Sequence, residues 1–475
     1  MTTTTPRPTS PGRPGRRQWR YADGGRRDLR LDLLRGYALA AMSVNHLGLS
    51  NSLFHRVSGQ SSFLISAAEA FLFISGYTIG WISVGRPPGD NEARLWSRTW
   101  VLYLATTGVT LGMILVALHT DLALWAGFEA GDFAGPFDAI GQAATLRLAV
   151  GGVDILVAYI LFLLATIPAI RAIERGRSVQ VAVAVGGAYA LSQLASPEAM
   201  VLGFASFRAV IANAPLFLGG LLLGYHRSAI AEAWRRIPGR RLADGVAVVL
   251  AVVLGVLHAR GWQDWPAIGD LLTAGNPEEP LWVRESELPV WPLLVVGLYL
   301  RVGWLIADRL WEPLRRTVGP VLLPLGQASL FTFVAHLVAI PVFLNLPGFP
   351  LDEDVSAPAA TAWVGAYLAA ILAAVHVRRA VLGWLRAGSP GREWLRSRGP
   401  AVAVAALAVA VIVSTDPSGQ AGAWGGSELD DGEEFEDREF DDELEDGGFE
   451  DGGFEDEEGA AQPTSSGISR LRRST

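Results

Sequence analysis

Long apolar runs, separated by polar connections, recur along most of this chain and restrict it to few folds. Each run spans about 15 to 25 residues, the length an α-helix needs to cross the hydrocarbon core of a bilayer. Half of the 475 residues are apolar, and the mean hydropathy is +0.30. Since lipid-exposed backbone must satisfy its own polar groups, the runs predict an all-α polytopic transmembrane bundle of about 10–11 helices. A soluble core is the weaker alternative.

The runs divide the chain into four predicted parts. They lie at roughly 31–49, 62–84, 99–118, 153–170, 178–194, 208–224, 243–259, 289–306, 319–344, 361–377 and 400–415. We expect a disordered basic arm at 1–30, a transmembrane domain at 31–378, a cytoplasmic linker with an extra transmembrane helix (400–415) at 379–426, and a disordered acidic tail at 427–475. The arm is expected to be retained, because the first run has no small-residue cleavage site after a short apolar core.

Arginines fall in alternate connections and predict their side of the membrane. They precede the first run at 26, 27 and 30, and the even connections carry them at 86, 94, 98, 171, 175, 177, 227, 235, 236, 240, 241, 309, 315, 316, 378, 379, 386, 392 and 396. The odd connections are acidic or neutral. The positive-inside rule then gives a multi-pass protein of the bacterial cell membrane with a cytoplasmic N-terminus.

Composition excludes several kinds of chemistry. The chain has no cysteine, which removes disulfides, thiolate metal ligands and a cysteine nucleophile. The histidines show no metal-ligand spacing, and no phosphate loop, dinucleotide fingerprint or serine elbow occurs. We therefore expect no metal, no bound cofactor and no nucleic-acid partner. Residues 428–458 hold 19 acidic side chains and one arginine, so the rest of the chain is basic; this tail is either solvating or binds a basic partner.

Ionisable residues inside the first two runs are the candidate functional site, because buried charges in hydrocarbon are costly and usually functional. The segment LDLLRGYALAAMSVNH contains Asp32, Arg35 and His46. Arg35 and His46 lie within about 20° on a helix and about 16 Å apart along its axis. We expect them to share a water-accessible groove. The structural alternatives are a snorkelling arginine paired with Asp32 and a histidine that only bonds a neighbouring helix.

Glu69 in the second run is expected to lie at the depth of His46. A carboxylate there would fix the imidazole tautomer and raise its basicity, as a general base requires. Small residues around Glu69, including Ser75 and Gly76, predict close helix packing. His336 in the ninth run is expected to face the same cavity. The predicted catalytic residues are thus Arg35, His46 and Glu69, and the predicted substrate-binding residues are Asp32, Asn45, Ser75, Arg94, Arg98 and His336.

The pattern Arg-x10-His within LDLLRGYALAAMSVNH, followed by AAEAFLFISGYTIG, resembles the OpgC family of membrane acyltransferases, relatives of the acyltransferase type 3 superfamily. The likeness is specific over residues 29–80. Shorter segments that resemble the family follow later in the chain: VDILVAYILFLLATIP at 153–168, Asn-Ala-Pro at 213–215 and LGQASLFTFVAH at 325–336. The eleventh run, the acidic tail and the arginine-rich arm are not part of the family pattern, and the divergence of the middle region leaves the acceptor undetermined.

The resemblance implies an acyl-CoA-dependent O-acyltransferase that moves a succinyl or acetyl group from cytoplasmic acyl-CoA to a hydroxyl of an envelope glycan or glycolipid. Arg35 and His46 then match the family's essential pair. Arg35, Arg94 and Arg98 would hold the donor phosphates, while His46 deprotonates the acceptor or carries the acyl group. The rival interpretations are a transporter or flippase of an envelope precursor and a non-catalytic scaffold that recruits partners through its tail.

Overall fold

The computed structural model describes residues 22–23, 27–58, 66–87, 89–119, 133–148, 152–194, 207–259, 290–350 and 355–386, with 398, 399, 401 and 404. Within these residues the chain forms fifteen helices and one two-residue strand pair, so the all-α prediction is confirmed. Ten of the eleven predicted runs fall on helices. The eleventh run at 400–415 lies outside the described residues except for 401 and 404, as do the acidic tail and residues 120–132 and 260–289.

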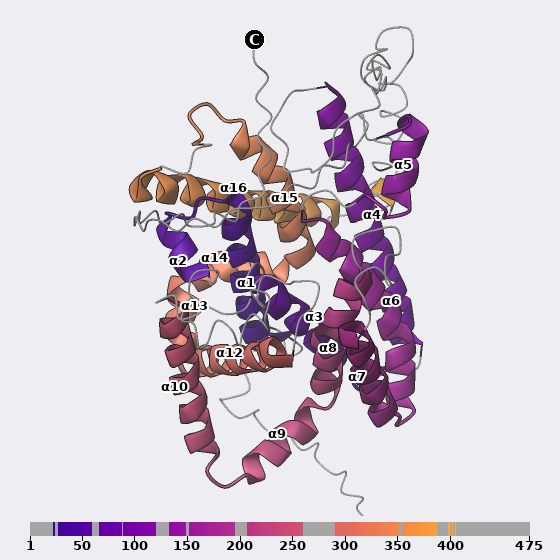
Figure 1. Ribbon diagram of the computed structural model, residues 1–475, viewed down its shortest axis with the longest axis vertical. Coiled ribbons are helices and arrows are strands. Elements are labelled where there is room, and N and C mark those ends of the chain that lie inside the picture. Colours follow the sequence, from indigo (N-terminus) through magenta and orange to yellow (C-terminus); the bar gives the residue numbers. More distant parts are fainter. Residues whose placement is uncertain are drawn as a thin grey trace, which may run out of the picture. The chain divides into compact units, whose positions relative to one another are not determined.

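The helices are numbered along the chain as in Figure 1. They are α1 (Leu29–Leu47), α2 (Leu53–Ser58), α3 (Ala67–Ser83), α4 (Asp90–His119), α5 (Pro136–Ala144), α6 (Asp154–Glu174), α7 (Ser178–Leu194), α8 (Phe207–Tyr225), α9 (Arg227–Arg236), α10 (Arg240–Ala259), α12 (Val290–Arg309), α13 (Trp311–Thr317), α14 (Gly319–Gln327), α15 (Ser329–Leu344) and α16 (Ala357–Arg386). Strands β1 (Ala22–Asp23) and β2 (Arg27–Asp28) pair antiparallel within the predicted basic arm.

Three of the described helices are long and apolar enough to cross a membrane. They are α4, α6 and α16, and a fourth span results if α14 and α15, which meet at an angle of 100°, count as one. Helix α1 is 19 residues long but carries Arg30, Asp32 and Arg35, which lower its hydropathy. The chain is therefore a helical membrane protein, while the number of crossings stays a prediction.

Helix α1 lies at the centre of the described helices and packs against α3, α12, α14, α15 and α16 (Figure 1). It begins after Asp28, whose carboxylate accepts the backbone N–H of Arg30, and it ends at Gly48, whose φ of +79° suits glycine. Its contact with α14 depends on glycines: a Cβ on Gly36 would lie 1.9 Å from the carbonyl oxygen of Leu322. This packing brings the charged first turns of α1 against the α14–α15 bend.

Helices α3 and α8 pack closely because each has glycines that face the backbone of the other. A Cβ on Gly76 or Gly80 would meet the carbonyl oxygens of Phe217 and Leu221 at 1.9 and 2.0 Å. In return, a Cβ on Gly224 would meet the carbonyl oxygen of Tyr77 at 2.0 Å. The backbones approach closely because no side chain intervenes, as in membrane helix pairs with small residues at four-residue spacing. The small-residue packing predicted around Ser75 and Gly76 is confirmed, and the pairing shows that the two helices run parallel.

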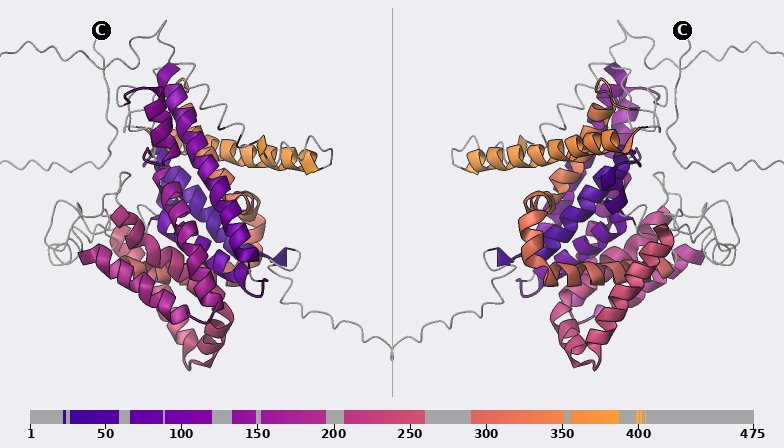
Figure 2. Two further views of the ribbon diagram at one scale, coloured as in Figure 1. Left: turned by 90° about the vertical axis from the view of Figure 1, so that its right-hand side faces the viewer. Right: turned by 90° about the vertical axis from the view of Figure 1, so that its left-hand side faces the viewer.

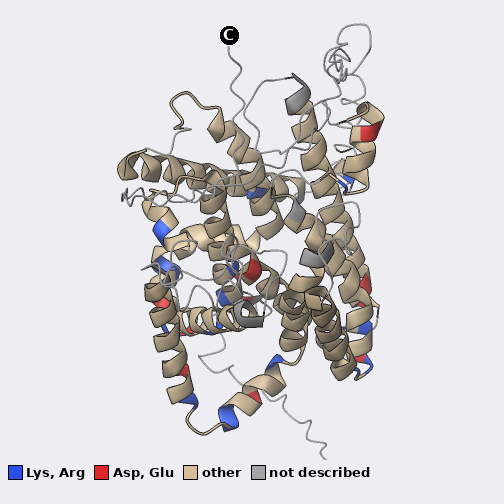
Figure 3. Ribbon diagram, in the orientation of Figure 1, with Lys and Arg blue, Asp and Glu red and all other residues tan. Residues whose placement is uncertain are grey.

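Contacts join the helix ends that the arginine pattern assigns to one side. Arg171 near the end of α6 pairs with Glu92 at the start of α4, and Arg30 at the start of α1 pairs with Asp308 at the end of α12. Figure 3 shows charged residues at the helix ends and turns, around the α9–α10 turn and α6, and a further small group near α1. The alternation of connections is thus consistent with the fold, although which side is cytoplasmic stays a prediction.

Helix α16 continues to Arg386, past the predicted domain boundary at 378. Its buried face packs on α15 and contains Ala360, Val364, Tyr367, Ile371 and Val375. Figure 2 shows α16 extending beyond the helices on which it packs. The side chains of Val377 and Trp384 near the end of α16 are exposed, which suits a lipid-facing surface.

Candidate functional site

Two predicted residues from distant parts of the chain meet directly. The Nδ1 atom of His46 on α1 lies 3.0 Å from the Nε2 atom of His336 on α15, a hydrogen-bond distance. The ring centroids are 5.2 Å apart, with a tilt of 33°. His336 is completely buried. The two imidazoles therefore meet, while the prediction that they face a common cavity stays a prediction.

The surroundings of His336 hold its ring in one orientation. The phenyl ring of Phe333, one turn earlier on α15, contacts the imidazole edge-on with 4.7 Å between centroids. The hydroxyl of Tyr367 on α16 donates a 2.9 Å hydrogen bond to the backbone carbonyl of His336. Tyr367 is itself completely buried. The histidine pair therefore lies on a backbone that three packed helices fix.

Arg35 contacts helix α3. Its Nη2 atom donates to Oγ1 of Thr78 at 2.7 Å and to the backbone carbonyl of Ile74 at 3.4 Å. The side chain is 6% exposed. A guanidinium in this position links α1 to α3, and it is poorly accessible to a phosphate group.

The predicted groove between Arg35 and His46 is wrong. Leu39 and Met42 occupy the same stripe of α1 between them, at four- and three-residue spacing, and both are buried in the main hydrophobic cluster. The stripe is filled because α1 is surrounded by packed helices, which sequence periodicity alone does not reveal. A substrate therefore cannot reach the histidines along the stripe of α1 between Arg35 and His46.

Glu69 caps its own helix. Its Oε2 accepts the backbone N–H of Ser66 at 3.0 Å, while Oγ of Ser66 accepts the backbone N–H of Glu69 at 3.4 Å. This reciprocal capping box explains why α3 begins where it does. The predicted role of Glu69 as the carboxylate that orients His46 stays a prediction.

Asn45, Ser75 and Asp32, the other predicted residues of α1 and α3, each have different surroundings. Oδ1 of Asn45 accepts a 2.6 Å hydrogen bond from the hydroxyl of Ser58 on α2. Ser75 is 1% exposed, and its hydroxyl forms no hydrogen bond with any residue that the structure describes. Asp32 is also buried, and its backbone carbonyl lies against Gly326. None of these three side chains is shown to meet the histidine pair.

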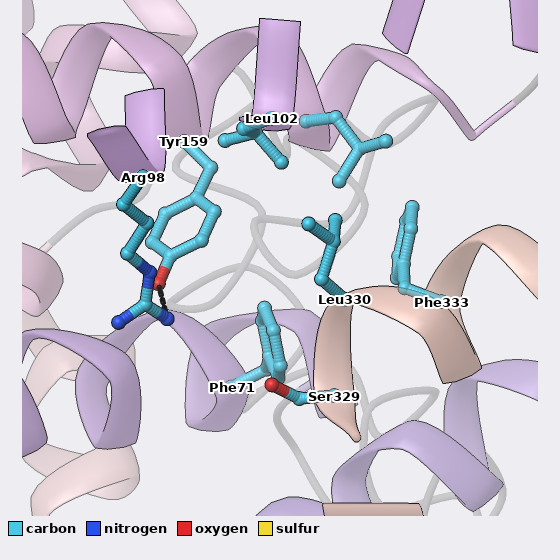
Figure 4. Close-up of a pocket in the computed structure, with 8 residues that line it drawn as sticks. Phe71, Arg98, Leu102, Tyr159, Ser329, Leu330 and Phe333 are labelled. Atoms are coloured by element: carbon cyan, nitrogen blue, oxygen red, sulfur yellow. Dashed lines mark hydrogen bonds between the residues drawn. The ribbon is translucent and has the colours of Figure 1, made fainter. Parts of the chain in front are cut away.

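Arg98 lines a small cavity between α3, α4, α6 and α15 (Figure 4). The cavity has about 20 Å³ of water-accessible volume, room for about one water. Figure 4 shows Arg98 and Tyr159 on one side and Leu330 and Phe333 on the other. The remaining wall is formed by Phe71, Leu102, Leu156 and Ser329. The ring of Phe333, which lines this cavity, also contacts the imidazole of His336.

A wider pocket opens beside the cavity on α4. Its volume is about 510 Å³, and it is lined by Asp90, Ala93, Arg94, Ser97, Arg98 and Val101. Arg98 lines both spaces, and its Nη2 donates a 2.7 Å hydrogen bond to the hydroxyl of Tyr159. The two arginines lie one helical turn apart, which suits an anionic ligand. Arg98 therefore borders both spaces, and Phe333 of the inner cavity contacts His336.

Sequence reasoning missed Tyr159, Phe333, Thr78 and Tyr367. Tyr159 and Phe333 belong to segments that are apolar throughout, where nothing separates a site-lining aromatic residue from a core one. Thr78 and Tyr367 have hydroxyl groups within apolar runs, and this feature could have indicated that they contact the site. No group of three or more potential metal ligands occurs within the described part of the chain.

Comparison with known proteins gives one match. A family model described as "OpgC protein" matches residues 27–385, which is most of the chain and ends with α16. No curated protein and no solved structure matches. The match includes α1, α3, α4, α6 and α15, the five helices that contribute the histidine pair and the arginine-lined spaces.

Proposed function

The chain belongs to the OpgC family, and on that premise we propose that it is an integral membrane O-acyltransferase. The donor is cytoplasmic acyl-CoA, and the acceptor is a hydroxyl of an envelope glycan or glycolipid. The observation that supports this proposal is the 3.0 Å contact between His46 and the buried His336, together with the cavity lined by Arg98 and by Phe333, the residue whose ring contacts His336. A base and an anion-binding pocket are the two parts that a charged thioester donor requires.

The donor phosphates are assigned to Arg94 and Arg98. Both arginines line the open pocket, and Arg98 also faces the inner cavity. Arg35 is a less suitable phosphate ligand because it is buried and bonded to Thr78. We assign Arg35 to the positioning of α1 against α3. The thioester arm then extends from Arg98 past Tyr159 toward Phe333.

His46 acts on the acceptor as a general base. Its imidazole takes the hydroxyl proton while the oxygen attacks the thioester carbonyl. The carbon–sulfur bond breaks, and the departing thiolate takes the proton from the imidazolium, so the products are the ester and free CoA. A second route starts with attack of the imidazole on the thioester and passes through an acyl-histidine that the hydroxyl then consumes. In both routes the ring of Phe333 has to move, because the cavity is too small for the donor.

Acyl transfer from labelled acyl-CoA, measured on the purified protein in lipid nanodiscs with extracted envelope glycans as acceptor, tests the proposal. His46→Ala is expected to reduce the rate by about 100-fold or more, the usual contribution of a general base. His226→Ala is the matched control, because His226 bonds Ser178 at the α7–α8 ends. Parent-level transfer by folded His46→Ala would contradict the proposal. Movement of a glycan or lipid without acyl-CoA consumption would favour the transporter instead.

A further inference from the structure

Arg98 borders both the inner cavity and the open pocket, and a neutral group holds its guanidinium. Its Nη2 atom donates a 2.7 Å hydrogen bond to the hydroxyl of Tyr159 on α6. Its Cζ atom lies 5.6 Å from the centroid of the Tyr159 ring, within the range of a cation–π attraction. Figure 4 shows the two side chains at one side of the cavity, joined by this hydrogen bond. Because a guanidinium can only donate, the Tyr159 oxygen is the acceptor and orients that edge of Arg98.

Tyr159 is itself fixed by close packing. Its side chain is 4% exposed. The ring contacts Phe71 of α3 edge-on, with 6.1 Å between centroids, and Phe217 of α8 edge-on, with 5.2 Å between centroids. Closely packed rings in a core occupy one arrangement. The hydroxyl is therefore a fixed acceptor, and the guanidinium that bonds it has a defined direction before any ligand arrives.

A neutral partner leaves the positive charge of Arg98 available to a ligand. Other arginines that join two helices pair with carboxylates: Arg30 with Asp308, Arg171 with Glu92 and Arg301 with Asp244. In the part of the chain that the structure describes, Arg98 has no carboxylate partner of this kind. A tyrosine hydroxyl orients a guanidinium without neutralising it, which suits a site that receives an anion.

The second arginine of the open pocket is not held in this way. Arg94 is exposed, and within the described residues no hydrogen bond or ion pair involves it. The charged residues that line the pocket are Arg94, Arg98 and Asp90, which leaves it with a net positive charge. An unrestrained side chain loses entropy when a ligand orders it, whereas Arg98 is already ordered. Arg98 therefore provides the preorganised part of this pocket.

We propose that Tyr159 is a positioning residue that holds the Arg98 guanidinium in place for an anionic oxygen, a phosphate of the acyl donor. This inference rests on the proposed function for the identity of the anion, and it adds the residue that orients the phosphate ligand. Tyr159 acts through Arg98 and does not have to contact the donor. The structural alternative is that the hydrogen bond only stabilises the contact between α4 and α6.

Tyr159→Phe separates positioning from packing, because it keeps the ring against Phe71 and Phe217 and removes only the acceptor. Inorganic pyrophosphate is the probe, and calorimetry measures its binding to the purified protein in lipid nanodiscs. We expect Tyr159→Phe to weaken pyrophosphate binding and to raise KM for acyl-CoA by about 3- to 10-fold with kcat unchanged, since Arg98 must then be ordered on binding.

Tyr103→Phe is the matched control for the loss of a tyrosine hydroxyl. The hydroxyl of Tyr103, which is on α4 like Arg98, donates a 2.9 Å hydrogen bond to the carbonyl of Ala144. Tyr103 lines neither the cavity nor the open pocket. Pyrophosphate binding and KM in Tyr103→Phe should match the parent.

A double-substitution cycle tests whether Tyr159 acts through Arg98. In the Arg98→Gln background, Tyr159→Phe should have no further effect on pyrophosphate binding, because the group that it positions is already absent. A further loss of the same size in that background would overturn the proposal, as would parent-level binding by folded Tyr159→Phe. A fall in kcat with unchanged KM would also overturn it, because Tyr159 would then act on the reacting atoms.

Nitrogen NMR of the arginine side chains provides a measurement on the parent that needs no Tyr159 variant. The Arg98 signals, assigned by their loss in Arg98→Gln, should show hindered rotation of the guanidinium without ligand, while Arg94 rotates freely. Fast rotation of the Arg98 guanidinium would overturn the proposal even if Tyr159→Phe does not fold.

The outcomes also separate the positioning role from the proposed function. If the parent binds pyrophosphate through Arg98 and Tyr159 but transfers no acyl group, the proposed function fails and the positioning role stands. If the parent transfers acyl groups and Tyr159→Phe matches it in KM and in pyrophosphate binding, only the positioning role fails. A parent that binds neither pyrophosphate nor CoA would overturn both.

Discussion

The ring of Phe333 contacts the imidazole of His336 edge-on, at 4.7 Å between centroids, and its other side lines the cavity of Arg98. Phe333 is 1% exposed. A smaller side chain at this position should join the cavity to the histidine pair. We predict that Phe333→Leu increases kcat/KM for donors with longer acyl chains relative to acetyl-CoA by about 10-fold, because one or two methylenes are worth about 1–3 kcal/mol in a fitted pocket. Competition between acyl-CoAs of different length measures this ratio.

Phe343→Leu provides the control for that experiment. Phe343 is on the same helix, but it packs against Trp363 and Tyr367 rather than against the cavity. Its substitution should lower stability by a similar amount without changing the chain-length preference. An unchanged preference in Phe333→Leu would show that the donor reaches the histidines by a different path.

The open pocket of Arg94 and Arg98 predicts recognition of the donor's phosphates. We expect Arg94→Gln to raise KM for acyl-CoA by about 10- to 100-fold with little change in kcat, since a hydrogen bond to a charged group contributes about 1.5–3 kcal/mol. The parent should also lose affinity for an acyl-CoA that lacks the 3′-phosphate. If Arg94 binds that phosphate, the two changes will not add.

Arg235→Gln is a suitable comparison for Arg94→Gln. Arg235 lies on α9, where it pairs with Glu232 within the same helix. Arg235→Gln should leave the KM for acyl-CoA unchanged. A phosphate-dependent rise in KM that is equal in both variants would indicate a general charge effect rather than a binding pocket.

The sequence predicts the helices well because length and hydropathy determine which segments can enter a membrane. Ten runs coincide with helices, and the glycine surface of α3 follows from residue size. The partner of His46 is harder to predict. Spacing relates His46 to residues of its own helix, whereas His336 is 290 positions away and reaches it only through the 100° bend between α14 and α15. Nothing in the local sequence specifies that angle.

Glu69 and Arg35 show a second limit of sequence reasoning. Each has the residue type that the predicted catalytic role requires and lies at approximately the expected depth in the membrane. Ser66 three residues before Glu69 forms a capping box, and this signal competed with the catalytic interpretation. For Arg35 the buried stripe of Leu39 and Met42 depends on neighbouring helices. For Arg35 the tertiary contacts therefore exclude the predicted groove, whereas the role of Glu69 stays a prediction.

Thr78 is predicted to contribute to stability through Arg35. Thr78→Val removes the 2.7 Å hydrogen bond to a buried guanidinium, which should lower the free energy of unfolding by about 1–3 kcal/mol. Thr99→Val is the matched control, because Oγ1 of Thr99 bonds only the carbonyl of Leu95 in its own helix, as Thr78 also does with Ile74. Thermal unfolding in detergent compares the two. Equal midpoints would show that the bond from Arg35 contributes nothing.

The contact between α3 and α8 predicts opposite effects for two glycine substitutions. Gly80→Ala would bring a Cβ to 2.0 Å from the carbonyl oxygen of Leu221, so the two backbones must separate. We expect a loss of about 1–3 kcal/mol, as for other overpacked cores, although alanine favours the helix by about 1 kcal/mol. Within the described part of the chain, no atom beyond the neighbouring residues and backbone of α8 itself lies within 4 Å of the position of a Cβ on Gly219. Gly219→Ala should therefore be neutral or stabilising. Thermal midpoints and monodispersity in detergent measure both variants, and a Gly80→Ala protein as stable as Gly219→Ala would show that close approach of α3 and α8 is not required.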